Sequence, residues 1–157
     1  MSVVVSVYGA DKESDEYQAA LKLKSIICDS LPTSVVGEIV LFSSATLIGQ
    51  AVKDVDLMMI GQLQNYSLNA EFNYKDEGII KDNVRIESFC TTIEIKRHDI
   101  SGIFVNGTDF YVYYGKEKHC VTLQSNNQKN SAMNFFKRVI SYSPYITNII
   151  WFKNHKT

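Results

Sequence analysis

The sequence predicts a single α/β domain in which a central mixed β-sheet is flanked by helices. Two segments have the apolar spacing of a helix, one near residues 14–30 and one after residue 126. The segments between and after them are rich in β-branched and aromatic residues, so the predicted order is helix, strands, helix, strand. With 157 residues, 45% of them hydrophobic, and only 2 prolines, the chain can bury one core, and no linker divides residues 1–157.

The first helix is predicted from residue 14 to about residue 30, after an opening segment, residues 1–10, that is a short strand or an arm. Its apolar face repeats at helical spacing through Tyr17, Ala20, Leu23 and Ile27. Ser14 is a suitable N-cap, and Glu16 in the first turn suits the helix dipole. Pro32 ends the helix, because the residue before a proline avoids helical geometry.

Extended segments follow this helix. Residues 35–49 and 54–63 are apolar and contain many β-branched side chains, which predicts two strands. Residues 61–83 are polar with short aromatic runs and indicate either a hairpin or a long loop. Residues 83–99 return to the strand pattern. Within residues 100–114 the pair Asn106-Gly107 separates two apolar, aromatic runs, which predicts a tight hairpin.

The second helix and the last strand complete the predicted fold. Residues 119–123 are a candidate for one more strand before the helix. Either Asn126 or Asn127 could cap this helix, whose apolar side carries Ala132, Phe135 and Val139. Pro144 ends it, and residues 145–152 have the pattern of a final strand.

Composition and charge exclude several classes of protein. The net charge of −1 argues against a protein that coats nucleic acid through its overall field. No apolar run approaches the ~18 residues of a membrane span, and we expect a soluble, cytoplasmic protein without a membrane partner. The three cysteines have no paired CxxC spacing, so we expect reduced and mostly buried thiols rather than a disulfide framework or a zinc site.

Two charged residues stand in the middle of a segment that otherwise resembles a buried strand. Side chains alternate along a strand, so Glu94 and Lys96 point to one face and Ile93 and Ile95 to the other. Asp56 is a third unexpected charge, because the residues around it resemble a strand buried on both faces. Charged groups are rarely buried unless they are paired or coordinated, so these three require a partner.

The predicted helices add two polar groups. Glu16 lies four residues before Ala20 and Gln128 four before Ala132, so each joins the apolar side of its helix near the N-terminal end. When carboxylates hold a divalent cation together, the free-energy cost of burying their charges is offset, and oxygen ligands of this kind suit Mg²⁺ or Mn²⁺. Beside such a cation Lys96 could orient a water, accept its proton if the lysine pKa is depressed, or stabilise charge on a phosphorane.

These residues resemble a known nuclease signature. Asp56 at the start of an apolar strand, followed by "IEIK" at 93–96, is similar to the D…ExK motif of the PD-(D/E)xK nuclease superfamily. Within it the chain most resembles the nuclease-related domain called NERD, with "SDEYQAALKL" matching the acid-bearing first helix through Glu16. The stretch "SNNQKNSAMNFF" resembles the later helix of that family through Gln128. The resemblance spans roughly residues 13–152.

The resemblance implies a restriction-endonuclease-like core and metal-dependent cleavage of DNA. Asp56, Glu94 and the carbonyl of Ile95 would hold Mg²⁺ or Mn²⁺. Lys96 would be catalytic, with Glu16 and Gln128 in supporting roles. Such domains often occur in longer chains beside helicase or other domains, so this one is expected to be a piece of a larger protein. Many enzymes of the superfamily pair to cut two strands, which implies a homodimer.

Two departures from the motif leave the assignment of Asp56 open. Val55 stands where the name of the superfamily has proline. Asp56 and Glu94 are 38 positions apart (94 − 56), so either the intervening segment contains an insertion or Asp56 is misaligned. Asp54, two residues earlier on the same strand face, is then the substitute ligand.

Other interpretations keep some of these observations and change the function. Glu94 and Lys96 could be an exposed ion pair on an edge strand, worth only ~0–1 kcal/mol. The domain could be a degenerate nuclease that binds nucleic acid or mediates protein assembly. It could also be an unrelated α/β ligand-binding or interaction module that takes up no metal.

Overall fold

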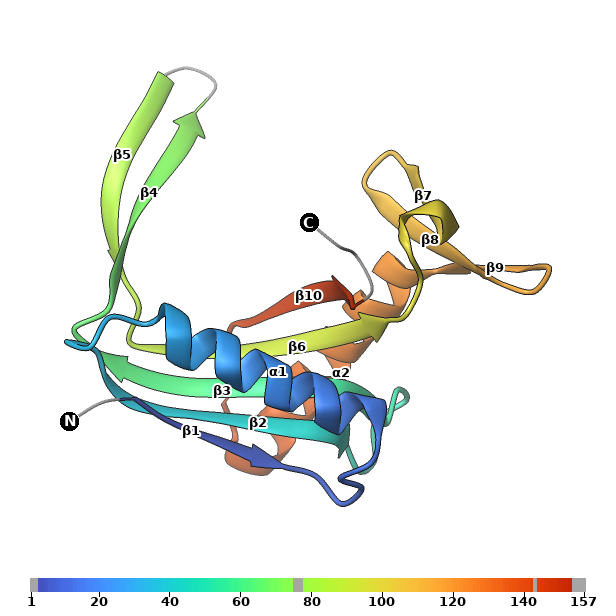
Figure 1. Cartoon of the computed structure of the whole chain (residues 1–157), viewed down its shortest axis with the longest axis horizontal. Helices are drawn as coiled ribbons and strands as arrows, with labels where there is room; N and C mark the ends of the chain where they lie inside the picture. Colours follow the sequence, from blue (N-terminus) through green and yellow to red (C-terminus); the bar gives the residue numbers. More distant parts are fainter. Residues whose placement is uncertain (1–2, 75–77, 143, 154–157) are drawn as a thin grey trace.

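The main structural unit is a five-stranded mixed β-sheet with one helix on each face (Figure 1). The computed structural model describes residues 3–74, 78–142 and 144–153, and for residues 72–74, 78–80 and 100 it describes the backbone alone. The strand order is β1-β2-β3-β6-β10. These strands are β1 (Val3–Tyr8), β2 (Val36–Thr46), β3 (Asp54–Gln64), β6 (Ser88–Lys96) and β10 (Ile146–Phe152). The predicted α/β class, with a mixed sheet between helices, is confirmed.

Strand directions make the sheet mixed. β2, β3 and β6 form an antiparallel meander, whereas β1 is parallel to β2 at one edge and β10 is parallel to β6 at the other. A parallel pair needs a long crossover, and here α2 (Val121–Ile140) lies in the connection between β6 and β10. The opening segment, for which the sequence allowed a strand or an arm, is therefore a strand.

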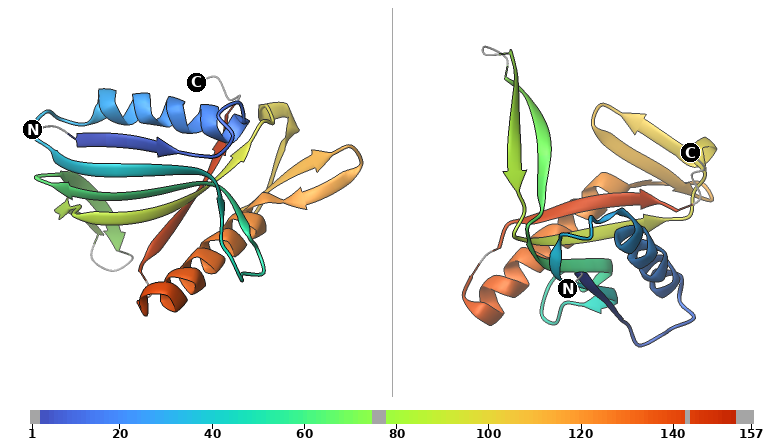
Figure 2. Two further views of the ribbon diagram at one scale, coloured as in Figure 1. Left: turned by 90° about the horizontal axis from the view of Figure 1, so that it is seen from below. Right: turned by 60° about the vertical axis from the view of Figure 1, so that its left-hand side comes forward.

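The first helix, α1 (Asp15–Ser30), forms where the sequence predicts it. The Oγ of Ser14 accepts the backbone N–H of Tyr17 at 3.1 Å, as expected of an N-cap. Ala20 is fully buried against one face of the sheet, and Leu23 and Ile27 pack around the same core. Figure 2 shows α1 and α2 on opposite sides of the sheet, so each face has its own apolar core.

The second helix differs from its prediction at its N-terminal end. It begins at Val121 rather than near Asn126, because β9 (Glu117–Cys120) runs directly into it and the Sγ of Cys120 accepts the N–H of Leu123. The predicted strand over residues 119–123 is therefore wrong beyond Cys120. The helix ends at Ile140 with Ser141 in the left-handed conformation, before Pro144. Ala132 is buried as predicted, but Val139 is 58% exposed.

The segment that the sequence left open as a hairpin or a loop is a hairpin. β4 (Ser67–Tyr74) and β5 (Gly78–Arg85) pair only with each other and project away from the main sheet (Figure 1). The hairpin connects β3 to β6, which remain direct neighbours in the sheet. Its tip, residues 75–77, lies outside the described part of the chain.

A separate three-stranded sheet follows β6. It comprises β7 (Ile103–Asn106), β8 (Asp109–Tyr114) and β9, after a short 3-10 helix, η1 (Ile100–Gly102). The predicted tight turn at Asn106-Gly107 is confirmed, and Gly107 has the positive φ of 62° that favours glycine there. Among the described residues, no helix has both the length and the apolar character needed to cross a membrane.

The three cysteines are free, and one departs from the expected burial: Cys28 is exposed, Cys120 is half-buried and Cys90 is buried. Burial raises the pKa of the Cys90 thiol to about 11. Because the thiolate is the reactive form, we expect a thiol reagent at pH 8 to label Cys28 at least about 100-fold faster than Cys90 in the folded protein. The Cys28→Ser variant is the control. Rapid labelling of Cys90 in that variant without denaturant would contradict the structure.

Candidate functional site

The candidate site lies where β3 begins and β6 ends. The antiparallel register between them runs as far as Leu57 opposite Ile93, and one further step sets Asp56 opposite Glu94. At that step the Oδ2 of Asp56 accepts the backbone N–H of Ile95 at 2.8 Å. The long spacing between the two acids is thus explained by the β4–β5 hairpin, which is inserted between two adjacent strands.

Glu94 and Lys96 form a buried ion pair on the face of β6 that α2 covers. Glu94 is 0% exposed and Lys96 is 6% exposed, and the Nζ of Lys96 lies 2.5 Å from the Oε1 of Glu94. Ile93 belongs to the core on the opposite face, as strand alternation predicts. Because β6 lies between β3 and β10, the interpretation of this pair as an exposed edge-strand pair is wrong.

Two glutamines of α2 complete the surroundings of this pair. The Nε2 of Gln128 donates to the Oε2 of Glu94 at 2.5 Å and to the main-chain oxygen of Asp54 at 3.4 Å. The Oε1 of Gln124 accepts from the Nζ of Lys96 at 3.2 Å. Gln124 was missed because the helix was expected to begin after it. Gln124 and Gln128 are four residues apart, so in a helix that begins earlier they lie on the same face, and this spacing would have identified Gln124.

The N-terminal end of α1 lies close to the same strand ends. Glu16 is half-buried, and its negative charge is among the causes that raise the pKa of Asp56. Asp15, which sequence reasoning did not select, forms ion pairs with Arg97 and with the Nζ of Lys153, the latter at 3.1 Å. The structure therefore gathers all five predicted side chains, Asp56, Glu94, Lys96, Glu16 and Gln128, around one end of the sheet.

Burial and charge shift the pKa values of the central groups. Burial raises the pKa of Asp56, against the lowering effect of the Ile95 N–H and of Lys96. Burial also raises the pKa of Glu94, and the charge of Asp56 adds to this effect. Burial alone would lower the pKa of Lys96, but its hydrogen bond to Glu94 and the charge of that carboxylate raise it overall. Lys96 is therefore protonated at neutral pH, which does not suit a proton acceptor.

The donor atoms are of the type that a hard divalent cation prefers. The described part of the chain contains no cluster of three or more His, Cys, Asp or Glu side chains that could hold a metal ion. The candidate ligands remain the two carboxylates of Asp56 and Glu94 and the predicted carbonyl of Ile95. Asp54 is exposed, and its main-chain oxygen accepts from Gln128. The Oε1 of Gln128 is buried and has no hydrogen-bond partner among the described residues, which leaves one more oxygen donor beside Glu94.

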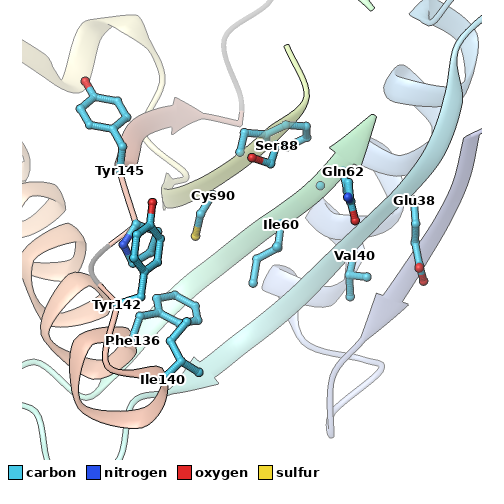
Figure 3. A pocket seen from close by; sticks show the side chains of 13 residues that line it. Glu38, Val40, Ile60, Gln62, Ser88, Cys90, Phe136, Ile140, Tyr142 and Tyr145 are labelled. Carbon is cyan, nitrogen blue, oxygen red and sulfur yellow. The ribbon is translucent and has the colours of Figure 1, made fainter. Parts of the chain in front are cut away.

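A larger cavity lies away from the candidate site. It has a volume of about 630 Å³ and opens between the sheet and the C-terminal half of α2, with Ile60, Cys90 and Phe136 on its walls (Figure 3). Cys90 is near the start of β6, whereas Glu94 is near its end. A cavity of about 320 Å³ is closer to the candidate site, because Gln124, the partner of Lys96, lines it with Lys118 and His119.

Comparisons with protein-family models, with curated proteins and with solved structures find no significant match for this chain.

Proposed function

We propose that the protein is a metal-dependent deoxyribonuclease that hydrolyses phosphodiester bonds at Asp56, Glu94 and Lys96. One observation carries this proposal: a buried carboxylate–ammonium pair lies beside a second carboxylate at the adjoining ends of two neighbouring strands. A buried ion pair is a poor way to stabilise a fold, since apolar residues of similar volume often serve as well or better. Buried titratable groups with shifted pKa values are more often found at functional sites.

The order of elements supports the same proposal. Without β1 and the two inserted sheets, the chain runs α1, β2, β3, β6, α2, β10, with the acids on β3 and β6. This arrangement agrees with the restriction-endonuclease-like core that the resemblance implies, in which helices cover both faces of the sheet. The NERD-like domain is therefore retained as the proposed classification.

Each residue would have a distinct role. Asp56, Glu94 and the Ile95 carbonyl would hold Mg²⁺ or Mn²⁺, which when bound polarises a phosphodiester and lowers the pKa of a water. Lys96, protonated at neutral pH, would stabilise negative charge on the phosphoryl oxygens. Gln128 holds the Glu94 carboxylate in place, and Glu16 adds negative charge near Asp56.

A second candidate function is a degenerate nuclease domain that binds nucleic acid without cutting it. It is favoured by the engagement of both Glu94 oxygens, because Lys96 contacts Oε1 and Gln128 contacts Oε2. A cation would have to share these oxygens with the two side chains. Cleavage separates the two functions, since only the first predicts strand scission.

The test is incubation of the protein with supercoiled plasmid and with single-stranded DNA in Mg²⁺, in Mn²⁺ or in EDTA. We expect nicked or shortened products with metal and none with EDTA. A Glu94→Gln protein purified in parallel controls for a contaminating nuclease and is expected to leave both substrates intact. The proposal fails if the folded wild type cuts neither substrate, or if Glu94→Gln cuts as fast as the wild type.

A further inference from the structure

The three-stranded sheet β7–β9 has an exposed face built from aromatic side chains. Its register pairs Phe104 with Tyr111 and Tyr113 with Lys118, so strand alternation places these four on one side, here called the aromatic face. Val112 points the opposite way and is fully buried where β8 packs against α2. Phe104 is 47% exposed and Tyr113 is 42% exposed. Neighbouring exposed rings on one face of a sheet are a surface that a partner can cover.

The aromatic face combines rings with a cation. The rings of Phe104 and Tyr113 lie 5.1 Å apart, nearly perpendicular to each other. The Nζ of Lys118 is 4.0 Å from the centre of the Tyr111 ring. Proteins that bind single-stranded nucleic acid use this combination, because bases stack on the rings while lysines contact the phosphates. The bases of a duplex are already stacked on one another and cannot do so.

Of the aromatic face, Lys118 lies nearest to the surroundings of the candidate active site. Lys118 also lines the cavity of about 320 Å³ that Gln124 shares, and Gln124 accepts a hydrogen bond from Lys96. In Figure 1 the β7–β9 sheet stands at the end of the main sheet where β6 ends. The ammonium of Lys118 gives the aromatic face a positive charge, which suits a polyanionic strand. Asp109, the carboxylate on this face, pairs with Asn106 at the opposite end of β8 from Lys118.

We propose that the aromatic face binds single-stranded nucleic acid by base stacking and directs the strand toward Asp56, Glu94 and Lys96. The second half of this statement rests on the proposed nuclease function, whereas the first half concerns binding alone. Lys118 would contact a backbone phosphate, and the rings of Phe104 and Tyr113 would each face a base.

The test measures binding in EDTA, where no metal-dependent cleavage occurs. A labelled oligothymidylate of about 12 nucleotides is titrated with protein, and binding is followed by fluorescence anisotropy. We expect Phe104→Ala and Tyr113→Ala each to weaken binding by about tenfold or more. Lys118→Gln is expected to reduce the salt dependence of the affinity by about one phosphate contact. Tyr145→Ala is the matched control, since Tyr145 is 85% exposed and lines the distant large cavity.

Each outcome decides the inference. It is overturned if the two alanine variants bind the oligonucleotide like the wild type, or if a duplex of equal length competes as well as the single strand. It is also overturned if Tyr113→Ala converts a dimer to a monomer in sedimentation without changing oligonucleotide binding, because the face is then a contact between two copies. Binding that requires the rings, in a protein that cuts nothing with metal, supports this inference and rejects the nuclease. If the protein cuts with metal but the ring substitutions leave its binding unchanged, the nuclease function is supported and this inference is rejected.

Discussion

Replacing Lys96 by methionine is expected to lower the free energy of unfolding by about 3–5 kcal/mol at pH 7. The substitution keeps most of the side-chain volume and removes the charge that lies 2.5 Å from the Oε1 of Glu94. Glu94 is 0% exposed, so water cannot replace the lost partner. Urea denaturation of the two proteins measures the difference. Lys81→Met is the matched control, because its ion pair with Glu71 is exposed and is worth at most about 1 kcal/mol.

The double variant Lys96→Met/Glu94→Gln shows whether the loss comes from an unpaired charge. The amide introduced at position 94 would carry no charge and could still bond Gln128, so we expect the double variant to recover much of the lost stability. If it is as unstable as the single variant, the cost of Lys96→Met arises from packing and not from the uncompensated carboxylate.

The loss in Lys96→Met is also expected to depend on pH. Burial already raises the pKa of Glu94 in the folded protein, and removal of the lysine charge raises it further. The folded state then binds the proton more tightly than the unfolded state. Stability is therefore highest below the ordinary glutamate pKa and declines as the pH rises through the folded value. The free energy of unfolding of Lys96→Met should fall below that of the wild type by less at pH 5 than at pH 7. An equal difference at the two pH values would show that the loss does not come from an ionised, unpaired Glu94.

The parts of the fold that the sequence predicted correctly are those with a strong local signal. The first helix has a serine cap and a regular apolar face, and Asn106-Gly107 is a pair that strongly favours a tight hairpin turn. The alternation in "IEIK" likewise separated the buried pair from Ile93. In each case a few neighbouring residues decide the local structure.

The features that were missed have either an unusual local signal or depend on contacts between distant segments. The second helix begins at Val121 with Cys120 as its cap, and cysteine is not a usual cap that a sequence pattern would reveal. Gln124 was therefore excluded from the predicted helix and from the site. Asp56 and Glu94 are close in space because residues 67–85 leave the sheet as a hairpin, so that β3 and β6 pair directly. The polar composition of residues 67–85 did not show whether they form a hairpin or a loop, so this closeness could not be predicted.

The same geometry favours Asp56 over Asp54 as the carboxylate of β3 that acts in the site. Asp56 is half-buried and its Oδ2 accepts the Ile95 N–H, next to Lys96 in the chain, whereas the side chain of Asp54 is exposed. Asp54 contributes its main-chain oxygen to Gln128, and any residue can provide that contact. A substitution at Asp54 therefore leaves the site intact, which makes it the matched control for a substitution at Asp56.

Asp56→Asn is accordingly expected to reduce the initial rate of plasmid nicking by at least about 100-fold, and Asp54→Asn by no more than about threefold. Asparagine still accepts the Ile95 N–H, so the fold persists, but it lacks the negative charge that draws a divalent cation. Nicking rates in Mg²⁺, with Mn²⁺ affinity measured by calorimetry, separate loss of the cation from loss of the fold. If Asp54→Asn has the larger effect on both, Asp54 is the ligand. If neither variant slows cutting or weakens Mn²⁺ binding, the carboxylates of β3 take no part in the reaction, and the chemistry depends on Glu94 and Lys96 without them.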